Sequence, residues 1–575
     1  MRRWFPFVLW LPELRRGRVL RADVVAGVTV AAIIVPQSMA YAGLAGLPAV
    51  YGLYASLLPP VIAAFWGSSR HLATGPVAMA SLISAATVQS VTPIDSSDYI
   101  TYSVLLALMV GVIRLTLGLL RLGVLINLLS APVVAGFTNA AALIIATSQL
   151  HHIFGVQVLA QEHHFETVLR VGESVSNGFH WQTVVMAVAT VGLIVFFRYR
   201  HEKILIAVAL STFTSWFIGF DGAVIGEIRG GLPPFQVPEI DFPITAKLFT
   251  GAFTLTLIGL MEALSIAKTL AAKSRQHINL NQELIGQGLS NVVGSFFGSY
   301  VVSGSFSRSA VTFSLGGVTG FSSAVCSVVV MLTLLFLTPL FHYLPQAALA
   351  AVIIVAVSGL FQSAPLRQIW RVSRSDGMIG LTTFAITLGF APQLHYGILV
   401  GVCLSLGQYL YRTMRPHVAY LARHGDGHLV DADEHGLALD GRIAVIRFDG
   451  RLYFGAASYF EDKVLEALVR LPELSHVIID AGGINEIDAS GEQILRRVVE
   501  NLRAIGVDVY FVRIKNQVEE ALTKAGTLDF VGKDHFFEWN QLALDHIYEK
   551  MEPTYKARSP LNVPTPSTKQ GAWSI

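Results

Sequence analysis

The run ATGPVA at residues 73–78 and the run VSGSFS at residues 302–307 decide the fold, because they resemble each other and occupy matching places in two halves of the chain. A polar residue lies in an apolar stretch at a similar distance upstream of each run: Gln37 in the first half and Glu262 in the second. The two runs are seven apolar segments apart. Because seven is an odd number, the two halves insert into the membrane with opposite topology. Inverted repeats with short, glycine-interrupted helices predict a secondary transporter site at mid-membrane. The alternative is chance similarity, since membrane helices are rich in small residues.

The composition is that of a membrane protein. Of 575 residues, 53% are hydrophobic and only 14% are charged, whereas soluble proteins have about 25% charged residues. Repeated apolar runs of ~20 residues match the length that a helix needs to cross ~30 Å of hydrocarbon. The net charge of +2 gives no reason to expect a nucleic-acid partner. Cys326 and Cys403 lie in apolar stretches and predict no disulfide framework.

We expect fourteen membrane segments, of which the third and the tenth are short. They are predicted at residues 23–45, 46–66, 73–90, 99–121, 124–150, 180–197, 203–220, 246–271, 281–299, 304–316, 319–340, 345–361, 376–392 and 394–412.

The domain boundaries follow from changes in composition. Residues 1–22 are predicted to be a cytoplasmic or interfacial segment, and residues 23–415 the transmembrane transport domain. Residues 424–441 are polar and rich in Gly and Asp. Alternating strand and helix patterns then predict a small cytoplasmic α/β domain at 430–550, followed by a disordered tail at 551–575 that is rich in Pro, Ser, Thr and Lys. The predicted strands are 443–448, 476–480 and 507–514, and the predicted helices are 457–470, 490–505 and 517–525.

Loop charges give the orientation. With both termini in the cytoplasm, most loop cations fall on the cytoplasmic side, as the positive-inside rule requires. They are Arg70, Arg121, Arg198, Arg200, Lys203, Lys273, Arg275, Arg367, Arg371, Arg374, Arg412 and Arg415, against Arg170, Arg229 and Lys247 on the other side.

The two short helices predict an anion site. Unpaired N–H groups and about half a positive charge lie at each helix N-terminus, so two such ends facing each other attract an anion. Hydroxyls can add donors and the glycines allow close approach of the backbone. The residues concerned are Thr74, Gly75, Pro76, Val77, Ser303, Gly304, Ser305, Phe306 and Ser307. The alternative is that the hydroxyls merely satisfy the backbone of the broken helices.

Three ionisable residues lie in apolar runs. Arg308, one turn into the second short helix, is expected to face the cavity, because an arginine at bilayer depth costs at least ~2.5–3.5 kcal/mol. Its charge argues against a neutral substrate. Arg114 has no counterpart in the other half, so we expect it to be paired structurally or to extend toward the cytoplasm. Glu262 could carry a proton or help to bind a cation, or could serve as a structural partner of Arg308; Gln37 and Tyr41 would line the opposite side of the site.

The loop histidines His151, His152, His163 and His164 suggest a metal site, but no cysteine and little ligand spacing support one. We therefore expect exposed loop histidines, no metal and no cofactor. The chain has no P-loop, no dinucleotide fingerprint within a βαβ unit and no nucleophile elbow, which argues against ATP-driven transport and against an enzyme.

At these residues the chain resembles the sulfate permease (SulP) family, the relatives of prestin and pendrin. The matching stretches are VPQSMAYAGL at 35–44, YGLY at 51–54, ATGPVA at 73–78, EALSIAK at 262–268, NLNQELIGQG at 279–288 and GSFSRSA at 304–310. The C-terminal part resembles a STAS domain, with IDASG at 487–491 as its signature turn. Ser490 corresponds to the residue that is phosphorylated in anti-sigma antagonists, and its role here stays open.

The resemblance implies a 7+7 inverted repeat of the UraA type, an elevator-like movement of a core domain against a gate domain, and a homodimer in the inner cell membrane. It places the anion between the third and tenth segments, lined by the first and eighth. Sodium-coupled bicarbonate members tend to carry Asp at the position of Glu262 and a hydroxyl one turn later. Here Ser265 stands at i+3 and Ile266 at i+4, which favours protons over sodium as the coupling ion.

The expected function is therefore proton-coupled secondary transport of an inorganic or small organic anion: sulfate first, with chloride, bicarbonate or a dicarboxylate as other possibilities. The alternatives are an uncoupled anion channel or exchanger, a voltage-responsive protein, a nucleobase permease, and a receptor that reports through the STAS domain.

Overall fold

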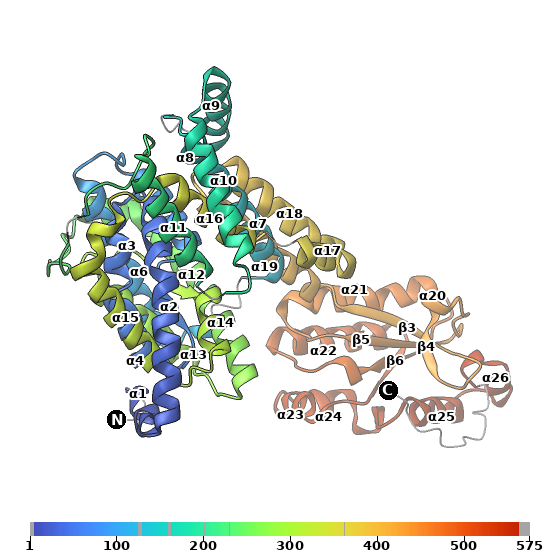
Figure 1. The fold of residues 1–575 in the computed structure, drawn as a ribbon. Helices are drawn as coiled ribbons and strands as arrows, with labels where there is room; N and C mark the ends of the chain where they lie inside the picture. The colour runs from blue at the N-terminus through green and yellow to red at the C-terminus, as the bar shows by residue number, and fades with distance from the viewer. Residues whose placement is uncertain are drawn as a thin grey trace. The chain divides into compact units, whose positions relative to one another are not determined.

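The computed structural model describes residues 5–124, 129–158, 163–200, 202–228, 230–361 and 363–562. The chain forms two compact units, Met1–Ser405 and Leu406–Ile575, with the boundary inside the helix His395–Met414. The first is a bundle of helices and the second is a sheet flanked by helices (Figure 1). Arg229, one of the residues used for orientation, and residues 563–575 of the predicted tail lie outside the described residues.

Helices make up almost all of the first unit, and two three-residue strands interrupt them. The elements are α1 (Phe7–Trp10), η1 (Leu11–Arg15), α2 (Gly17–Leu44), α3 (Ala49–Ala55), α4 (Leu58–Trp66), β1 (Ala73–Gly75), α5 (Ala78–Gln89), α6 (Asp98–Leu119), α7 (Ala131–Ser148), α8 (Leu150–Phe154), α9 (His164–Asn177), α10 (Trp181–Phe196), α11 (Lys203–Ile218), α12 (Phe242–Ser274), α13 (Leu280–Ser295), β2 (Ser303–Ser305), α14 (Phe306–Ser314), α15 (Phe321–Leu332), η3 (Thr333–Leu337), η4 (Thr338–Phe341), α16 (Gln346–Ser358), α17 (Ser363–Val372), α18 (Arg374–Gly389) and α19 (His395–Met414).

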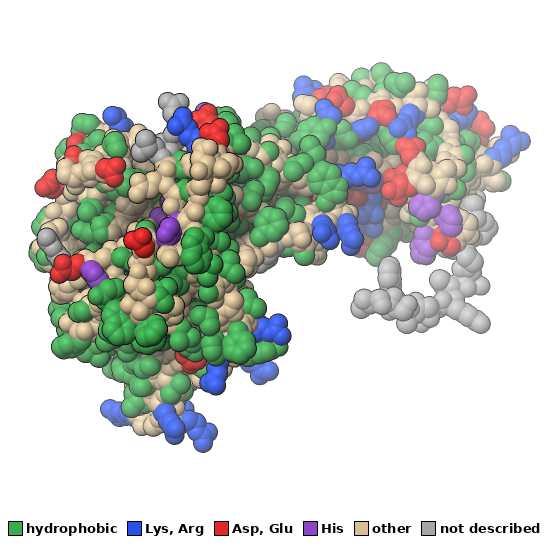
Figure 2. All heavy atoms as spheres, turned by 45° about the horizontal axis from the view of Figure 1, so that its top comes forward, with side chains coloured by type: hydrophobic (Ala, Val, Ile, Leu, Met, Phe, Trp, Pro, Cys, Tyr) green, Lys and Arg blue, Asp and Glu red, His purple; other side chains and the backbone are tan. Residues whose placement is uncertain are grey.

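The helical unit has the dimensions and the surface of a membrane protein. Each of the fourteen predicted segments overlaps a helix or a pair of consecutive helices. In the described part of the chain, seven helices are long and apolar enough to cross a bilayer, and an eighth span results if the bent pair α9–α10 is counted as one. Large apolar side chains such as Phe196, Phe213 and Phe217 are exposed, and hydrophobic groups cover much of the visible surface of this unit (Figure 2). Such a surface suits lipid rather than water.

Helix packing follows the predicted inverted repeat. Helix α2 of the first half corresponds to α12 of the second, and α6 corresponds to α15. Accordingly, α2 packs against α15 and α12 packs against α6. Likewise α4 packs against α15 while α13 packs against α6, and α10 packs against α16 while α7 packs against α18. Matching pairs in the two halves therefore make matching contacts.

Three local features differ from the prediction. Helix α2 begins at Gly17, within the segment predicted to precede the membrane domain. Its Asp23 is fully buried, and its carboxylate accepts hydrogen bonds from the backbone N–H groups of Val318 and Thr319. The amphipathic helices α9 and α17 lie in regions predicted as loops. The partners of Asp23 lie far along the chain, so the sequence around Asp23 does not show that α2 begins before it.

The second unit has a six-stranded sheet in the order β4-β3-β5-β6-β7-β8. Strands β5 to β8 are parallel, and the hairpin β3–β4 joins β5 antiparallel. The elements are β3 (His417–Arg423), β4 (Leu429–Asp431), α20 (Ala432–His435), β5 (Ile443–Asp449), α21 (Phe454–Arg470), β6 (His476–Asp480), η5 (Ala481–Gly483), α22 (Ala489–Ala504), β7 (Asp508–Val512), α23 (Asn516–Lys524), α24 (Thr527–Val531), η6 (Lys533–His535), β8 (Phe536–Phe537), α25 (Asn540–Lys550), α26 (Pro553–Arg558) and η7 (Pro560–Asn562).

Two apolar layers hold this sheet. One cluster joins α21, α22 and α23 to one face, and a smaller one joins α25 to the other. All six strands and helices predicted between residues 443 and 525 are present, within a few residues at their ends. The sheet, however, begins at His417, before the predicted domain start at 430. The structure also places α26 and the buried Leu561 within the range predicted as a disordered tail.

Candidate functional site

The two runs that suggested the site lie side by side. Strands β1 and β2 pair antiparallel, with Ala73 opposite Ser305, Thr74 opposite Gly304 and Gly75 opposite Ser303. The hydroxyl of Ser309 ties the strands further, because it accepts a hydrogen bond from the N–H of Ala73 at 2.8 Å and donates to the carbonyl of Ser305 at 2.6 Å. This short ribbon therefore brings residues from opposite halves of the chain into one place.

A helix N-terminus follows each strand of the ribbon. Helix α5 starts after Val77 and α14 after Ser305, and neither has a side-chain cap or an acidic residue in its first turn. The N-cap side chains of both helices therefore accept no hydrogen bond from the first N–H groups, and no carboxylate in the first turn offsets the positive helix ends. Pro76 and Val77 are buried beside them.

Gly75 allows the close approach of backbone to side chain that the site needs. Its φ is +151°, a conformation that residues with a Cβ rarely adopt. A Cβ at this position would lie 3.3 Å from Nη2 of Arg308 and 3.1 Å from Cδ1 of Ile34. The absence of a side chain at Gly75 thus makes room for the guanidinium group.

Arg308 is the buried cation of the site. Its side chain comes from the first turn of α14 and the residue is 1% exposed. Among the described residues, its Nε and Nη2 have no hydrogen-bond partner. It lines a cavity of about 10 Å³ together with Thr74, Ile34 and Cys326. A buried guanidinium with free donors is costly unless something else satisfies it.

The other predicted lining residues lie around this group. Tyr41 is buried and lies within electrostatic range of both Arg308 and Glu262. Gln37, one turn earlier on α2, is 3% exposed, and its Oε1 has no partner among the described residues. Glu262 on α12 is only partly exposed and interacts electrostatically with Arg308 and Arg114. Among the described residues no direct ion pair joins Glu262 to either arginine.

Not every predicted residue presents a free group to the site. The hydroxyl of Ser303 donates to the carbonyl of Gly259 at 3.1 Å, so it satisfies helix α12 instead. Phe306 is 57% exposed, and Ser307 is also exposed, with its Oγ 3.4 Å from that of Ser305. Ser265 lies on an exposed position of α12. Of the hydroxyls predicted for the site, Thr74 lines the cavity beside Arg308, which the unpredicted Thr312, Ser322 and Ser323 also line.

Three buried polar residues outside the predicted anion site hold the ribbon. Arg114 is fully buried, and its Nη1 donates to the carbonyl of Val302 at 2.9 Å while Nη2 donates to that of Leu255 at 3.2 Å. Of the two roles considered for Arg114, the contacts match structural pairing. Asn291 accepts from the N–H of Val302 at 2.9 Å and donates to its carbonyl at 3.1 Å. Gln287 donates to Oγ1 of Thr74 at 2.7 Å.

The loop histidines differ from the prediction in part. His151 and His152 lie in the short helix α8, partly buried, with ring centroids 3.9 Å apart. His164 is also partly buried, with its Nε2 2.7 Å from Oγ1 of Thr147, whereas His163 is exposed as expected. Packing of α8 against α10 and α16 buries the first pair.

Comparison with known proteins places this geometry in a family. Residues 20–383 match the sulfate permease family and residues 437–543 match the STAS domain. A chloroplastic sulfate transporter of Arabidopsis thaliana is 33% identical over 562 residues, 93% of this chain and 81% of that protein. A probable sulfate transporter of Mycobacterium tuberculosis is 33% identical over 544 residues, 93% of this chain and 96% of that protein.

Solved structures agree with the fold. The murine anion transporter Slc26a9 in its inward-facing state superposes with a TM-score of 0.86 at 25% identity, covering 95% of this chain and 94% of that one. The transmembrane domain of the cyanobacterial bicarbonate transporter BicA has a TM-score of 0.59 at 24% identity, covering 67% of this chain and 98% of that one. With its inverted helical repeat and its C-terminal STAS domain, the chain belongs to the sulfate permease family of membrane transporters.

Proposed function

We propose that this protein is a proton-coupled secondary transporter of small anions, with sulfate as its main substrate. The observation that carries the proposal is the β1–β2 ribbon, which leads at either end into an uncapped helix N-terminus, that of α5 or α14, beside the buried Arg308 with its free Nε and Nη2. Backbone N–H groups and a guanidinium are donors that match the oxygens of an oxyanion. An anion bound there would supply the partner that Arg308 lacks.

The anion site of this proposal is built on the ribbon. Gln37, Tyr41, Thr74, Gly75, Pro76 and Val77 come from the first half of the chain, and Ser303, Gly304, Ser305, Phe306, Ser307 and Arg308 from the second. Within this set, Arg308 provides charge, Thr74 and the helix ends provide donors, and Gly75 provides room. The exposed Phe306 and Ser307 would contact substrate only in a conformation that turns α14 toward the site.

Transport requires the site to open, since the cavity beside Arg308, about 10 Å³, has room for one water molecule but not for a tetrahedral oxyanion. It lies between α2, α4, β1, α14 and α15, so some of these elements must separate when substrate enters. This favours an elevator-like transporter, in which a core domain moves against a gate domain, rather than a channel with a permanently open pore.

Glu262 is the proposed proton carrier, with Ser265 as a neighbouring hydroxyl. A carboxylate at bilayer depth is costly when it is ionised, so protonation is an accessible alternative. Arg308 favours the ionised form, and an arriving anion offsets that effect. Anion and proton therefore help each other to bind, as linkage between two sites requires. A titrating Glu262 near Arg308 favours protons, rather than sodium, as the coupling ion.

Sulfate is favoured because the Arabidopsis and Mycobacterium relatives, each 33% identical and matched over 93% of this chain, are named as sulfate transporters. The loop charges support a multi-pass protein of the inner cell membrane with both termini in the cytoplasm. We further propose that it works as a homodimer.

Uptake of labelled sulfate into proteoliposomes tests the proposal. We expect accumulation above equilibrium when an inward proton gradient is imposed, and competition by unlabelled sulfate that exceeds competition by chloride, bicarbonate or a dicarboxylate. If sulfate uptake is the same with and without the proton gradient, the result would instead support the alternative, an uncoupled anion exchanger or channel.

A further inference from the structure

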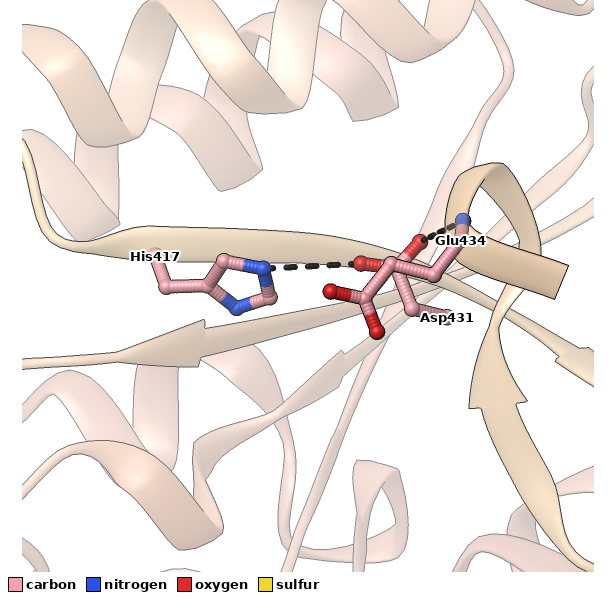
Figure 3. A group of neighbouring side chains, drawn as sticks. All are labelled: His417, Asp431 and Glu434. Carbon is pink, nitrogen blue, oxygen red and sulfur yellow. Dashed lines mark hydrogen bonds and ion pairs between the residues drawn. The ribbon is translucent and has the colours of Figure 1, made fainter.

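A group of side chains in the C-terminal unit has the composition of a metal site. His417 is the first residue of β3, Asp431 is the last residue of β4 and Glu434 lies in α20. Each offers one ligand atom, and these atoms lie within 4.8 Å of one another. Figure 3 shows the imidazole of His417 pointing toward the carboxylate of Asp431, with Glu434 beside it. We propose that these three residues bind one divalent transition-metal ion of the zinc type.

The sheet register places the histidine. His417 lies directly opposite Asp449 of β5, and Leu421, four residues further along β3, lies opposite Asp431. Residues 417 and 421 share one face of the strand, because side chains alternate with a period of two. On that face the side chain of His417 lies between two carboxylates, with Nδ1 3.6 Å from Oδ2 of Asp449 and Nε2 3.5 Å from Oδ2 of Asp431.

The distance between His417 Nε2 and Asp431 Oδ2 suits a shared ion better than a direct hydrogen bond. Hydrogen bonds between nitrogen and oxygen have lengths of about 2.7–3.2 Å. Two ligands at ~2.0–2.1 Å from a tetrahedral zinc ion are about 3.3 Å apart. The 3.5 Å between His417 Nε2 and Asp431 Oδ2 is close to that separation, so only small side-chain movements would be needed.

The surroundings leave the correct atoms free. Oδ1 of Asp431 accepts hydrogen bonds from the N–H groups of Asp433 at 2.9 Å and Glu434 at 3.5 Å. This cap holds the carboxylate in place, and Oδ2 stays available to a metal. On the other side of the ring, Arg447 donates to Oδ1 of Asp449 at 2.8 Å. Oδ2 of Asp449 lies 3.6 Å from Nδ1 of His417, so a small side-chain movement would let it accept from Nδ1–H and direct Nε2 to the metal, as partners of metal-binding histidines commonly do.

The choice of metal follows from the ligands. One imidazole nitrogen and two carboxylate oxygens suit zinc or a similar ion and leave a fourth position for water. Magnesium and calcium favour all-oxygen ligand sets. Since His417 follows α19 by three residues and Glu434 lies beyond β4, a bound ion would fasten the first residue of the sheet to the short helix α20 that follows the hairpin.

The chain offers a matched control. His424 lies in the β3–β4 turn with its Nδ1 3.2 Å from Oδ1 of Asp426, and its side chain is 46% exposed against 59% for His417. This is a second exposed His–Asp pair in the same hairpin, and among the described residues it is not part of a group of three ligands. Loss of His424 should therefore leave the proposed site intact.

Zinc titration of the full-length protein in detergent, prepared without a polyhistidine tag and freed of metal, tests the proposal. We expect His417→Gln and Glu434→Gln each to lose one equivalent of bound zinc or to weaken it at least tenfold, and His424→Gln to bind like the parent. Asp449→Asn should weaken the same equivalent by about 10–100-fold. Zinc bound elsewhere, for example by His151 and His152, should be the same in the parent and all variants. It therefore does not affect the difference in zinc binding between them.

Cobalt provides a second readout. The parent and His424→Gln should give a visible absorption band at one equivalent of Co²⁺ that is absent from His417→Gln and Glu434→Gln. Glu434 is exposed, so its replacement by Gln should not change the thermal unfolding of the metal-free protein. Equal zinc stoichiometry and affinity in the parent, His417→Gln and Glu434→Gln would overturn the proposal.

Discussion

Replacement of Gly75 by Ala probes the most constrained position of the candidate site. Its φ of +151° is a backbone conformation that costs a residue with a Cβ on the order of 1–3 kcal/mol. The new Cβ would also lie 3.3 Å from Nη2 of Arg308 and 3.1 Å from Cδ1 of Ile34. The guanidinium must therefore shift by a few tenths of an ångström, or the ribbon must deform.

Two effects follow. The free energy of unfolding should fall by about 1–3 kcal/mol because of the strain. Sulfate binding should weaken as well, because a hydrogen bond from a charged donor is worth about 1.5–3 kcal/mol and the displaced Arg308 loses part of it. Since 1.4 kcal/mol corresponds to a tenfold change, the Kd for sulfate should rise about tenfold.

Both quantities can be measured on purified protein, by calorimetric titration with sulfate and by thermal unfolding. Gly43→Ala is the control, because Gly43 is a helical residue of α2 whose added Cβ would meet nothing within 4 Å. Sulfate affinity should stay at the parent value, and the unfolding temperature should stay the same or rise slightly, because alanine favours a helix over glycine. A Gly75→Ala variant that unfolds at a lower temperature but binds sulfate as tightly as the parent would refute the placement of the anion beside Arg308.

Three further predictions concern coupling, the domain boundary and pH. Glu262→Gln should still exchange sulfate at equal concentrations but fail to accumulate it under an inward proton gradient; undiminished accumulation would rule out its coupling role. A chain ending at residue 415 should elute as a monodisperse species in size-exclusion chromatography, whereas one ending at residue 429 retains β3 without β5 and should aggregate; equal behaviour would contradict the boundary at His417. Burial lowers the pKa of His476, although Asp508 opposes this effect, so the domain should lose stability as the pH falls below about 6.5. His476→Gln should reduce this loss in pulse proteolysis between pH 7.5 and 5.5, and an unchanged pH dependence would show that other groups cause it.

The membrane fold could be predicted from sequence because its signals are local. A helix that crosses a bilayer must carry an apolar run of a defined length, and the runs around residues 73–78 and 302–307 mark where two of the helices are interrupted. The structure pairs these same residues, Thr74 opposite Gly304, in the ribbon. Their similarity in sequence was therefore a correct indication of their equivalence in space.

The hydrogen-bond partners of individual side chains could not be predicted in the same way. Ser303 and Ser305 look alike in sequence, yet the first donates to the carbonyl of Gly259, 44 positions away. Arg114 was recognisable as a buried cation in need of a partner, but its acceptor, the carbonyl of Val302, is 188 positions away. Asn291 left a weak signal as a polar residue in an apolar helix. The packing of α6 against α13 brings Arg114 and Asn291 together, and the contact of α12 with β2 brings Ser303 to Gly259.

The hairpin at the start of the C-terminal sheet was missed for a different reason. The stretch HVAYLAR at 417–423 is buried on both faces, so apolar residues do not alternate with polar ones. The glycines and aspartates that follow favour a linker when they are considered alone. In the structure they form the turn between β3 and β4, which places His417 within reach of Asp431 and Glu434.

Sulfate binding to Arg308→Ala, with Arg308→Lys beside it, examines the anion site itself. If Arg308 supplies the charge that holds the anion, its loss should raise the Kd for sulfate by about 10–100-fold, the equivalent of 1.5–3 kcal/mol. The protein should remain folded, because two of the guanidinium nitrogens have no partner among the described residues. Lysine should restore part of the affinity, since it retains the charge but not the planar geometry. A folded Arg308→Ala variant that binds sulfate with the affinity of the parent would contradict the account and leave the two helix ends as sufficient on their own.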